Sequence, residues 1–316
     1  MSSRVALLTS GGDTPGMNAA INGAYDQIKA HGGQTLGVRF GFAGLAKRDA
    51  HSITADEARS HLGRSGTWLG SSRWPDMRSD AGVKSCVNAL SDLKVDGLIV
   101  LGGDGSLQAA CRLAAHFSPI AFLPCTIDND IVGTPMTIGM DSAVNYAVDV
   151  LERLRCTGRS LPGRGFLVET LGGSSGNLAD AVAHKAVISD VLVPERRTDL
   201  GDIAERFRQL APTGAAIAVM SEGYGDAVSI SGELTRLSGV RVRPTILGHA
   251  QRAADPTRLD RTLARRAAEA AVDELASGDS TFISLGDAGA ITAAPLLSTR
   301  DQLVPISKTH YQREPA

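Results

Sequence analysis

Three polar turns, at residues 11–13, 102–106 and 126–130, carry the side chains of this sequence that could do chemistry. Glycine lets a backbone approach an anion closely, and a helix that begins just after such a turn offers free N–H groups to phosphate. Asp104, inside the turn 102–106, would repel phosphate unless a cation such as Mg²⁺ lay between them. This turn therefore predicts nucleotide phosphates with Mg²⁺. A plain strand, turn and helix with Asp104 as the helix cap fits the same residues.

The turn at 126–130 reads Thr-Ile-Asp-Asn-Asp and follows the apolar run at 119–124. It shows neither a helical period nor the alternation of a strand. Asp128 and Asp130 stand only two residues apart, so this part of the chain has to hold two nearby negative charges. We therefore expect this turn to belong to a functional site.

Several cationic or ionisable side chains lie near the ends of expected strands. Arginine binds phosphate through paired N–H groups, and a group of such donors favours a phosphate pocket. Taken singly, each of them could equally be a solvated strand edge. The side chains are Arg73 and Arg78 in the loop 66–78, Arg164 before a strand, and Arg243, His249 and Arg252 around a later strand.

Strand and helix patterns alternate along the chain and must position these turns. We expect strands at 4–10, 34–41, 96–101, 119–124, 164–170, 190–195, 214–223 and 281–286, and one that begins at 242. Helical periodicity predicts helices at 19–32, 107–117, 141–155, 177–187 and 258–278. This alternation indicates α/β architecture with mostly parallel sheets, in which ligands bind at the carboxyl ends of strands.

Length and composition exclude several classes of protein. The chain has 316 residues, which suits two closely joined lobes. Its net charge of −2 does not indicate a nucleic-acid or membrane surface, and no apolar run is long enough to span a bilayer. The four cysteines form no CxxC pair, so we expect reduced thiols in a cytoplasmic protein and no zinc site.

Six segments together resemble one family, the ATP-dependent 6-phosphofructokinases of the bacterial type. They are "LTSGGDTPGMNAAI", "GTWLGSSRWP", "GGDGS", "TIDNDIVGT", "LVPE" and "TILGHAQR", in the family's order between residue 4 and about residue 262. The resemblance implies two Rossmann-like three-layer lobes with mostly parallel sheets. Residues 1–140 and 254–305 would form the nucleotide and magnesium lobe. Residues 141–253 and 306–316 would form the sugar-phosphate lobe.

The resemblance also implies roles for individual residues. Asp128 would be the catalytic base, assisted by Thr126, Asp130 and Arg73, and Asp104 would hold Mg²⁺. ATP would contact Gly11, Arg73, Arg78, Gly103, Gly105 and Ser106. The sugar phosphate would contact Thr126, Asp128, Arg164, Leu171, Gly172, Glu222, Arg243, His249 and Arg252. In the family the counterparts of Arg164 and Arg243 come from a neighbouring subunit, which implies a homodimer or homotetramer with shared active sites.

The sequence departs from the family at a strand end and at two markers of the phosphoryl donor. Leu171-Gly172-Gly173 replaces Met-Gly-Arg, so an arginine that helps to neutralise the γ-phosphate is missing unless another cation substitutes for it. The loop at 253–255 also differs. Pyrophosphate users carry Asp at the position of Gly105 and Lys at that of Cys125, whereas ATP users carry Gly at both. Gly105 therefore favours ATP, Cys125 matches neither group, and no histidine partner for a nucleophilic Cys125 is evident.

The family's effector site has lost most of its cations. Its arginines on the first helix are Asn22 and Asp26 here, its basic cluster is replaced by residues 211–216, and only Arg155 remains. An anionic effector would lack partners, so we expect neither activation by ADP nor inhibition by phosphoenolpyruvate.

Three functions remain open on the sequence. The first is phosphoryl transfer from ATP to the 1-hydroxyl of fructose 6-phosphate or of a close ketose 6-phosphate. The second is a specialised paralogue that acts on a different ketose phosphate or transfers another part of ATP, such as pyrophosphoryl. The third is a partner subunit without activity, against which the retained Asp104 and Asp128 argue. A lipid or NAD kinase would lack "TIDND" and "GHAQR".

Overall fold

The computed structural model describes residues 3–214, 216–286 and 289–296. It divides into two compact units, each formed by more than one stretch of chain. The first unit contains the chain up to residue 126, residues 130–138 and the chain from residue 258 onward. The second contains residues 127–129 and 139–257. The sequence predicted that the chain passes between the two units near residues 140 and 254. The segment 306–316, predicted to belong to the second unit, lies outside the described residues.

The first unit is built on one sheet. Its strands are β1 (Arg4–Ser10), β2 (Gln34–Val38), β3 (Ala50–Ser52), β4 (Gly97–Gly102), β5 (Ile120–Thr126), β6 (Ile138–Gly139), β11 (Thr281–Leu285) and β12 (Ile291–Pro295). Within the described part of the chain they form an eight-stranded sheet of order β12-β11-β5-β4-β1-β2-β3, with β6 paired to β5. The neighbours from β11 to β2 are parallel, and β3 and β12 are antiparallel at the edges.

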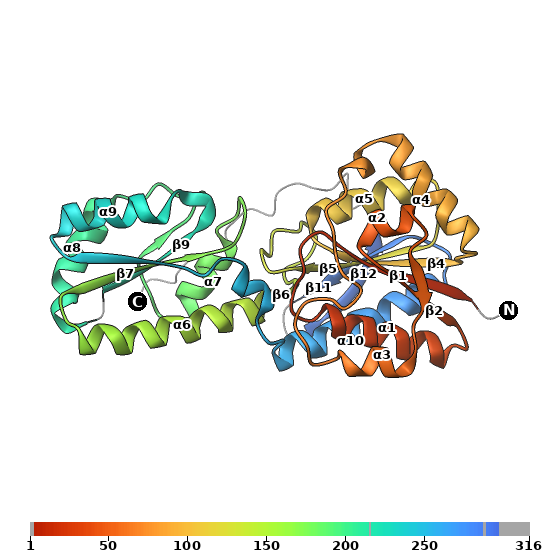
Figure 1. Cartoon of the computed structure of the whole chain (residues 1–316), viewed down its shortest axis with the longest axis horizontal. Helices are drawn as coiled ribbons and strands as arrows, with labels where there is room; N and C mark the ends of the chain where they lie inside the picture. The colour runs from red at the N-terminus through yellow and green to blue at the C-terminus, as the bar shows by residue number, and fades with distance from the viewer. Residues whose placement is uncertain (1–2, 215, 287–288, 297–316) are drawn as a thin grey trace. The chain divides into compact units, whose positions relative to one another are not determined.

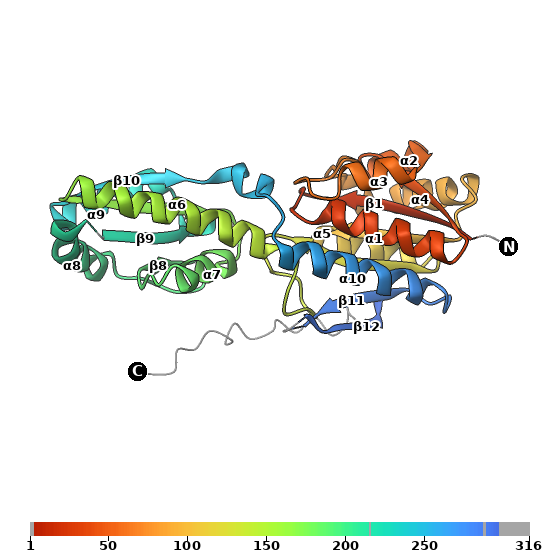
Figure 2. The ribbon, with the colours of Figure 1, turned by 90° about the horizontal axis from the view of Figure 1, so that it is seen from below.

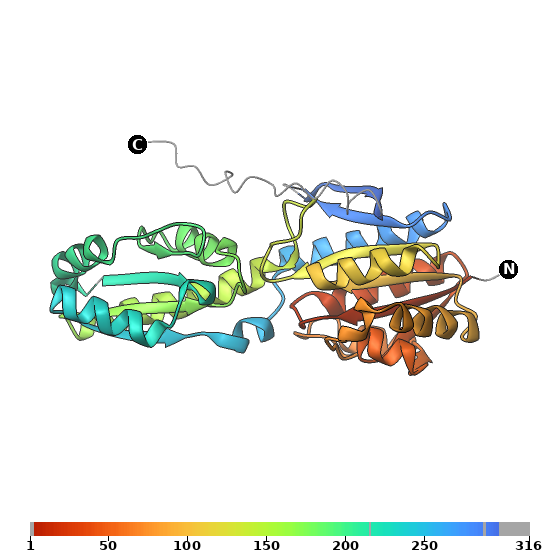
Figure 3. The ribbon, with the colours of Figure 1, turned by 90° about the horizontal axis from the view of Figure 1, so that it is seen from above.

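Helices cover both faces of this sheet (Figure 1). One face packs on α1 (Met17–Ala30), α3 (Ala55–Ser60) and α10 (Arg258–Leu275), of which α1 and α10 lie in front when seen from below (Figure 2). The other packs on α2 (Gly41–Ala46), α4 (Asp80–Asp92) and α5 (Asp104–Ala114), seen from above in Figure 3. In β1, Val5 and Leu7 enter the first core and Ala6 and Leu8 the second, because successive side chains alternate across a strand.

The second unit repeats the three-layer plan with a smaller sheet. Its strands β7 (Arg164–Thr170), β8 (Val191–Leu192), β9 (Ala216–Ser221) and β10 (Arg241–Ile246) are parallel, in the order β10-β7-β9-β8. One core contains α6 (Met140–Ser160) and α7 (Asn177–Lys185), and the other contains α8 (Leu200–Leu210) and α9 (Ala227–Ser238). The predicted fold class, two three-layer α/β lobes with mostly parallel sheets, is confirmed.

Four short 3-10 helices complete the described secondary structure: η1 (Pro75–Arg78), η2 (Ala211–Thr213), η3 (Glu222–Tyr224) and η4 (Gly248–Ala253). No helix among the described residues combines the length and the apolar character that crossing a membrane requires.

Candidate functional site

The carboxyl ends of three neighbouring strands meet at one edge of the first sheet. β1, β4 and β5 are adjacent and parallel, and they end at Ser10, Gly102 and Thr126. Thr126 is buried, and a Cβ atom added to Gly103 would lie 3.5 Å from its Cβ atom. The turns that follow β1 and β4 therefore lie beside the start of the turn at 126–130, as the strand order of an open α/β sheet requires.

Helix α5 begins at Asp104, three residues earlier than the sequence pattern indicated. Gly103 is the N-cap in an extended conformation, and its carbonyl accepts hydrogen bonds from the amides of Ser106 and Leu107 at 3.0 Å each. The donors at the helix end that an anion could reach are then the amides of Asp104 and Gly105. A Cβ atom on Gly105 would have no protein atom within 4 Å, so the space above this helix end is open.

The Asp104 carboxylate stands at this helix end but does not cap it. Its Oδ2 atom accepts a 2.7 Å hydrogen bond from Gln108 Nε2, one turn along α5. Among the described residues, no group of three His, Cys, Asp or Glu side chains could hold a metal ion. Mg²⁺ commonly uses one or two carboxylates together with substrate phosphates and water. A single aspartate beside amides that a phosphate could reach therefore fits that ion.

Hydrogen bonds join the loop 66–78 to Gly11, the residue after β1. Arg73 therefore lies near Gly11, although the two residues are far apart in the sequence. Gly11 N donates to Ser72 O at 3.1 Å, and Ser71 Oγ donates to Gly11 O at 2.8 Å. Arg73 and Arg78 are exposed. Within the described residues neither guanidinium makes a hydrogen bond or an ion pair, so both are available to a ligand.

The turn at 126–130 passes from one unit to the other within two residues. Thr126 O accepts a 2.7 Å bond from Thr137 Oγ1 in the first unit, whereas Ile127 is fully buried in the core of the second. Asn129 takes a left-handed conformation with φ 49°, and its carbonyl accepts a 2.7 Å bond from Asn177 Nδ2. Asp128 is half-buried with a buried Oδ1 atom, and Asp130 is exposed. The buried isoleucine, which the sequence analysis did not single out, fixes the backbone on which Asp128 stands.

The strand end that carries Leu171-Gly172-Gly173 is held by Glu222. Glu222 Oε1 accepts from the amides of Gly172, at 3.2 Å, and Gly173, at 2.8 Å. Both glycines have positive φ, 146° and 57°, and a Cβ atom on Gly172 would lie 2.6 Å from Ser175 O. A Cβ atom on Gly173 would meet nothing within 4 Å. Close packing excludes a side chain at residue 172, whereas at residue 173 only the left-handed backbone conformation favours glycine.

The four cationic or ionisable side chains predicted around a sugar phosphate do not share one edge of the second sheet. His249 and Arg252 belong to η4, which follows the carboxyl end of β10. Arg164 is the first residue of β7, and Arg243 pairs in register with Phe166. A strand rises about 3.3 Å per residue, so Arg164 lies roughly 20 Å from the carboxyl end of β7. One chain therefore does not bring Arg164 beside Arg252.

Two residues near Leu171 were missed by the sequence analysis. Gln251 is fully buried, and its Oε1 atom accepts a 2.7 Å bond from Leu171 N, so the "GHAQR" segment supports the strand end. Burial raises the pKa of the Glu169 carboxyl, and the carboxylates of Glu222 and Asp226 raise it further. Ionisation of the Glu169 carboxyl, near the end of β7, is therefore disfavoured.

Cys125 lies in the core of the first unit and is 1% exposed. Burial, and to a lesser degree the charge of Asp260, raise the pKa of its thiol well above the usual range. A nucleophile needs the thiolate form, so a structural role fits this residue. All four cysteines are free thiols.

Comparison with known protein families and sequences identifies similar proteins. The family model described as "Phosphofructokinase" matches residues 4–275. An "ATP-dependent 6-phosphofructokinase" of Brevibacillus brevis is 38% identical over 277 residues, which cover 87% of this chain and 86% of that protein.

Comparison with solved structures gives the same family. Phosphofructokinase from Saccharomyces cerevisiae matches with a TM-score of 0.86 and 26% identity, over 95% of this chain and 45% of the yeast chain. A pyrophosphate-dependent phosphofructokinase from Marinobacter aquaeolei matches with a TM-score of 0.84 at 20% identity, over 95% of this chain and 84% of that one. The latter likeness shows a shared fold.

Proposed function

The chain belongs to the phosphofructokinase family, and from this premise we propose that it transfers the γ-phosphoryl group of ATP to the 1-hydroxyl of fructose 6-phosphate. The observation that carries the proposal is the set of turns after β1, β4 and β5. They retain the family's glycines and carboxylates at the ends of three adjacent strands. Relatives named as ATP-dependent 6-phosphofructokinases support the choice of donor and acceptor.

The first unit supplies the nucleotide site in this proposal. The triphosphate would contact the turn at Gly11 and the helix end formed by Gly103, Gly105 and Ser106, while Arg73 and Arg78 neutralise its negative charge. Asp104 would hold Mg²⁺, which when bound reduces the repulsion between the phosphates and an incoming oxygen. Phosphoryl transfer depends mainly on such positioning and charge neutralisation.

Asp128 is the general base in this proposal. Its carboxylate accepts the proton of the sugar 1-hydroxyl while that oxygen forms a bond to the γ-phosphorus and the bond to the β-γ bridging oxygen breaks, which releases ADP. Ile127, buried in the core, keeps the base in position. Thr126 would contact the transferred group, and Asp130 would orient the base.

The sugar phosphate would be bound by Leu171, Gly172, Glu222, His249 and Arg252 of one chain together with Arg164 and Arg243 of a second chain. The distance along β7 from Arg164 to Leu171 supports this division, since one 6-phosphate group cannot contact both Arg164 and Arg252 of the same subunit. We therefore propose a homo-oligomer, dimer or tetramer, with shared active sites. The free thiols and the ATP substrate are in keeping with a cytoplasmic enzyme.

An endpoint ³¹P NMR assay tests this function and the identity of the donor. The chain is incubated with Mg²⁺ and fructose 6-phosphate, and with other ketose 6-phosphates, together with either ATP or pyrophosphate. We expect ADP and fructose 1,6-bisphosphate from ATP, and no turnover with pyrophosphate. AMP as the nucleotide product, turnover of a different sugar phosphate only, or consumption of pyrophosphate would contradict the proposal.

A further inference from the structure

Two buried polar side chains lie on either side of the turn at 11–13 and belong to none of the substrate sites proposed above. Thr9 is the last residue but one of β1, and Asn18 is the second residue of α1. They are 0% and 1% exposed. Burying a polar side chain costs free energy unless the protein satisfies its hydrogen bonds. The partners of these two side chains therefore indicate which part of the chain they stabilise.

The hydroxyl group of Thr9 joins the end of β1 to the loop 66–78. Thr9 Oγ1 donates to Gly70 O at 2.8 Å and lies 3.0 Å from Thr67 Oγ1. Because a hydroxyl has one proton to donate, the hydroxyl of Thr67 is the donor in the second bond. Thr9 thus fixes the loop at two points, of which the later, Gly70, shortly precedes Arg73.

The amide group of Asn18 joins the chain around the start of this loop to α1. Its Nδ2 atom donates to Arg64 O at 3.0 Å and to Ser65 O at 3.3 Å, and its Oδ1 atom accepts a 3.0 Å bond from Trp68 N. Both ends of the amide are therefore bound, which fixes its orientation. Residues 64–68 are held against the first turn of α1 in this way.

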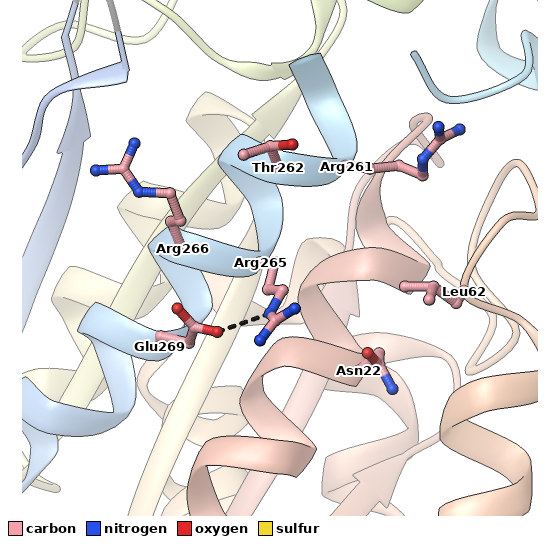
Figure 4. Close-up of a pocket in the computed structure, with 7 residues that line it drawn as sticks. All are labelled: Asn22, Leu62, Arg261, Thr262, Arg265, Arg266 and Glu269. Atoms are coloured by element: carbon pink, nitrogen blue, oxygen red, sulfur yellow. Dashed lines mark hydrogen bonds and ion pairs between the residues drawn. The ribbon is translucent and has the colours of Figure 1, made fainter. Parts of the chain in front are cut away.

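The chain that leads into the loop runs along the same side of α1. Asn22 follows Asn18 by one helical turn, and side chains four residues apart share a helix face. Asn22 and Leu62 line one pocket beside α10 (Figure 4). The chain therefore passes this face of α1 between Leu62 and Trp68, where Asn18 bonds to it.

The guanidinium of Arg73 is positioned by the backbone of the loop. Arg73 is exposed, and within the described residues its guanidinium makes no hydrogen bond or ion pair. Ser72, the residue before it, is bound at two points: its carbonyl accepts from Gly11 N at 3.1 Å, and its Oγ atom donates to Phe40 O at 2.7 Å. Phe40 N in turn donates to Leu69 O at 3.0 Å. The position of Arg73 therefore depends on the hydrogen bonds that hold the loop.

From these contacts we propose that Thr9 and Asn18 are positioning residues for phosphoryl transfer: they hold the loop 66–78 so that Arg73 reaches the transferred group. The inference rests on the kinase function proposed above, in which Arg73 neutralises phosphate charge. Both residues are buried and act through Arg73. A misplacement of about 1 Å in such a group can lower a rate about a hundredfold. A loop that has lost part of its hydrogen bonds would spend less time in the productive position.

A double-mutant cycle with Arg73→Ala tests the proposal in steady-state kinetics with ATP and fructose 6-phosphate. Thr9→Val keeps the shape of the side chain and removes its hydroxyl, so we expect kcat to fall at least about tenfold while the KM for fructose 6-phosphate stays unchanged. Thr9→Ser keeps the hydroxyl and should keep most of the activity. In the Arg73→Ala background, Thr9→Val should lower kcat no further, because residues that act as one unit are not additive. Asn18→Ala should behave as Thr9→Val does.

Thr35→Val is the matched control for the loss of a buried hydroxyl. Thr35 is buried in β2 of the same sheet, and its hydroxyl has no hydrogen-bond partner among the described residues. Its replacement should therefore leave kcat unchanged and not lower the melting temperature. The proposal is wrong if Thr9→Val and Asn18→Ala keep the wild-type kcat. It is also wrong if they lower kcat as much in the Arg73→Ala background as in the wild type.

Tryptophan fluorescence tests the position of the loop without turnover. The chain has two tryptophans, Trp68 and Trp74, and both lie half-buried in this loop. Quenching of their emission by acrylamide should increase in Thr9→Val and Asn18→Ala, but not in Thr9→Ser or Thr35→Val. An inactive wild type would refute the kinase function, and with it the role proposed here. Unchanged quenching in both variants of an active chain would refute the positioning role alone.

Discussion

By its resemblance to the family, the sequence carries Gly173 where an arginine would help to neutralise the γ-phosphate. The Gly173 amide donates to Glu222 Oε1, and a side chain at this position would enter open space. We predict that Gly173→Arg restores a cation near the γ-phosphate and raises kcat with ATP at least about tenfold. Because the backbone at residue 173 is left-handed, with φ 57°, any side chain there would lower the stability by about 1 kcal/mol.

Gly173→Ala is the matched control, because it introduces the same backbone strain without a guanidinium. The kcat with ATP and the melting temperature are measured for both variants, and only Gly173→Arg should have the higher kcat. An unchanged kcat in Gly173→Arg would mean that another cation already neutralises the γ-phosphate in the wild type.

The raised pKa of Glu169 predicts a pH-dependent stability. The pKa of its carboxyl is higher in the folded chain than in the unfolded chain, so its charge destabilises the fold once the pH exceeds the unfolded pKa of about 4.5. Glu169→Gln should therefore raise the melting temperature at pH 7, and this gain should disappear at pH 4. Glu274→Gln on α10 is the control, and an equal gain there would refute the cause assigned to Glu169.

At the scale of elements, the crossing of α1 and α10 depends on one glycine. A helical glycine usually costs stability, but a methyl group at Gly23 would overlap the backbone of Arg265. We predict that Gly23→Ala lowers the free energy of unfolding by about 1–3 kcal/mol. Gly232→Ala in α9, where a methyl group meets nothing within 4 Å, should raise it by about 0.5–1 kcal/mol. Urea denaturation measures both, and a stabilised Gly23→Ala variant would show that the helices can separate.

Strands and helices could be predicted from the sequence where apolar residues form long runs or a clear helical period. The strands that became β1, β4, β5, β7 and β11 were predicted within a few residues, as was the amphipathic α10. The helices α4, α8 and α9 were not singled out. The start of α5 was misplaced because Asp104 and Gly105 look like turn residues, although they form the first turn of the helix.

The candidate site was predictable only where motifs mark single residues. Glycines and carboxylates at strand ends pointed to Gly11, Asp104 and Asp128. The sequence could not show that Ile127 enters the core of the second unit or that Gln251 supports Leu171, because both depend on contacts between segments distant in sequence. The sequence predicted that Arg164 begins a strand. The distance between Arg164 and Arg252 could be judged only from the register of β7 and β10.

At the scale of the whole molecule, the proposal of shared active sites predicts complementation between two inactive chains. Asp128→Asn and Arg243→Ala should each be nearly inactive alone. When they are co-expressed, mixed dimers contain one intact site, so about a quarter of wild-type activity should return. Arg241→Ala, on the same strand, is the control and should be active by itself. Failure to regain activity in purified mixed oligomers would place both residues in the same subunit's site.

The proposed kinase activity is best tested by the rate of fructose 1,6-bisphosphate formation from ATP and fructose 6-phosphate, in the wild type and in Asp128→Asn. The substitution keeps the size of the side chain and removes the base, so we predict an active wild type and a kcat about 10²–10⁴-fold lower in the variant. The melting temperature should not change. A wild type that forms no fructose 1,6-bisphosphate, or a variant that forms it as fast, would contradict the function proposed for this chain.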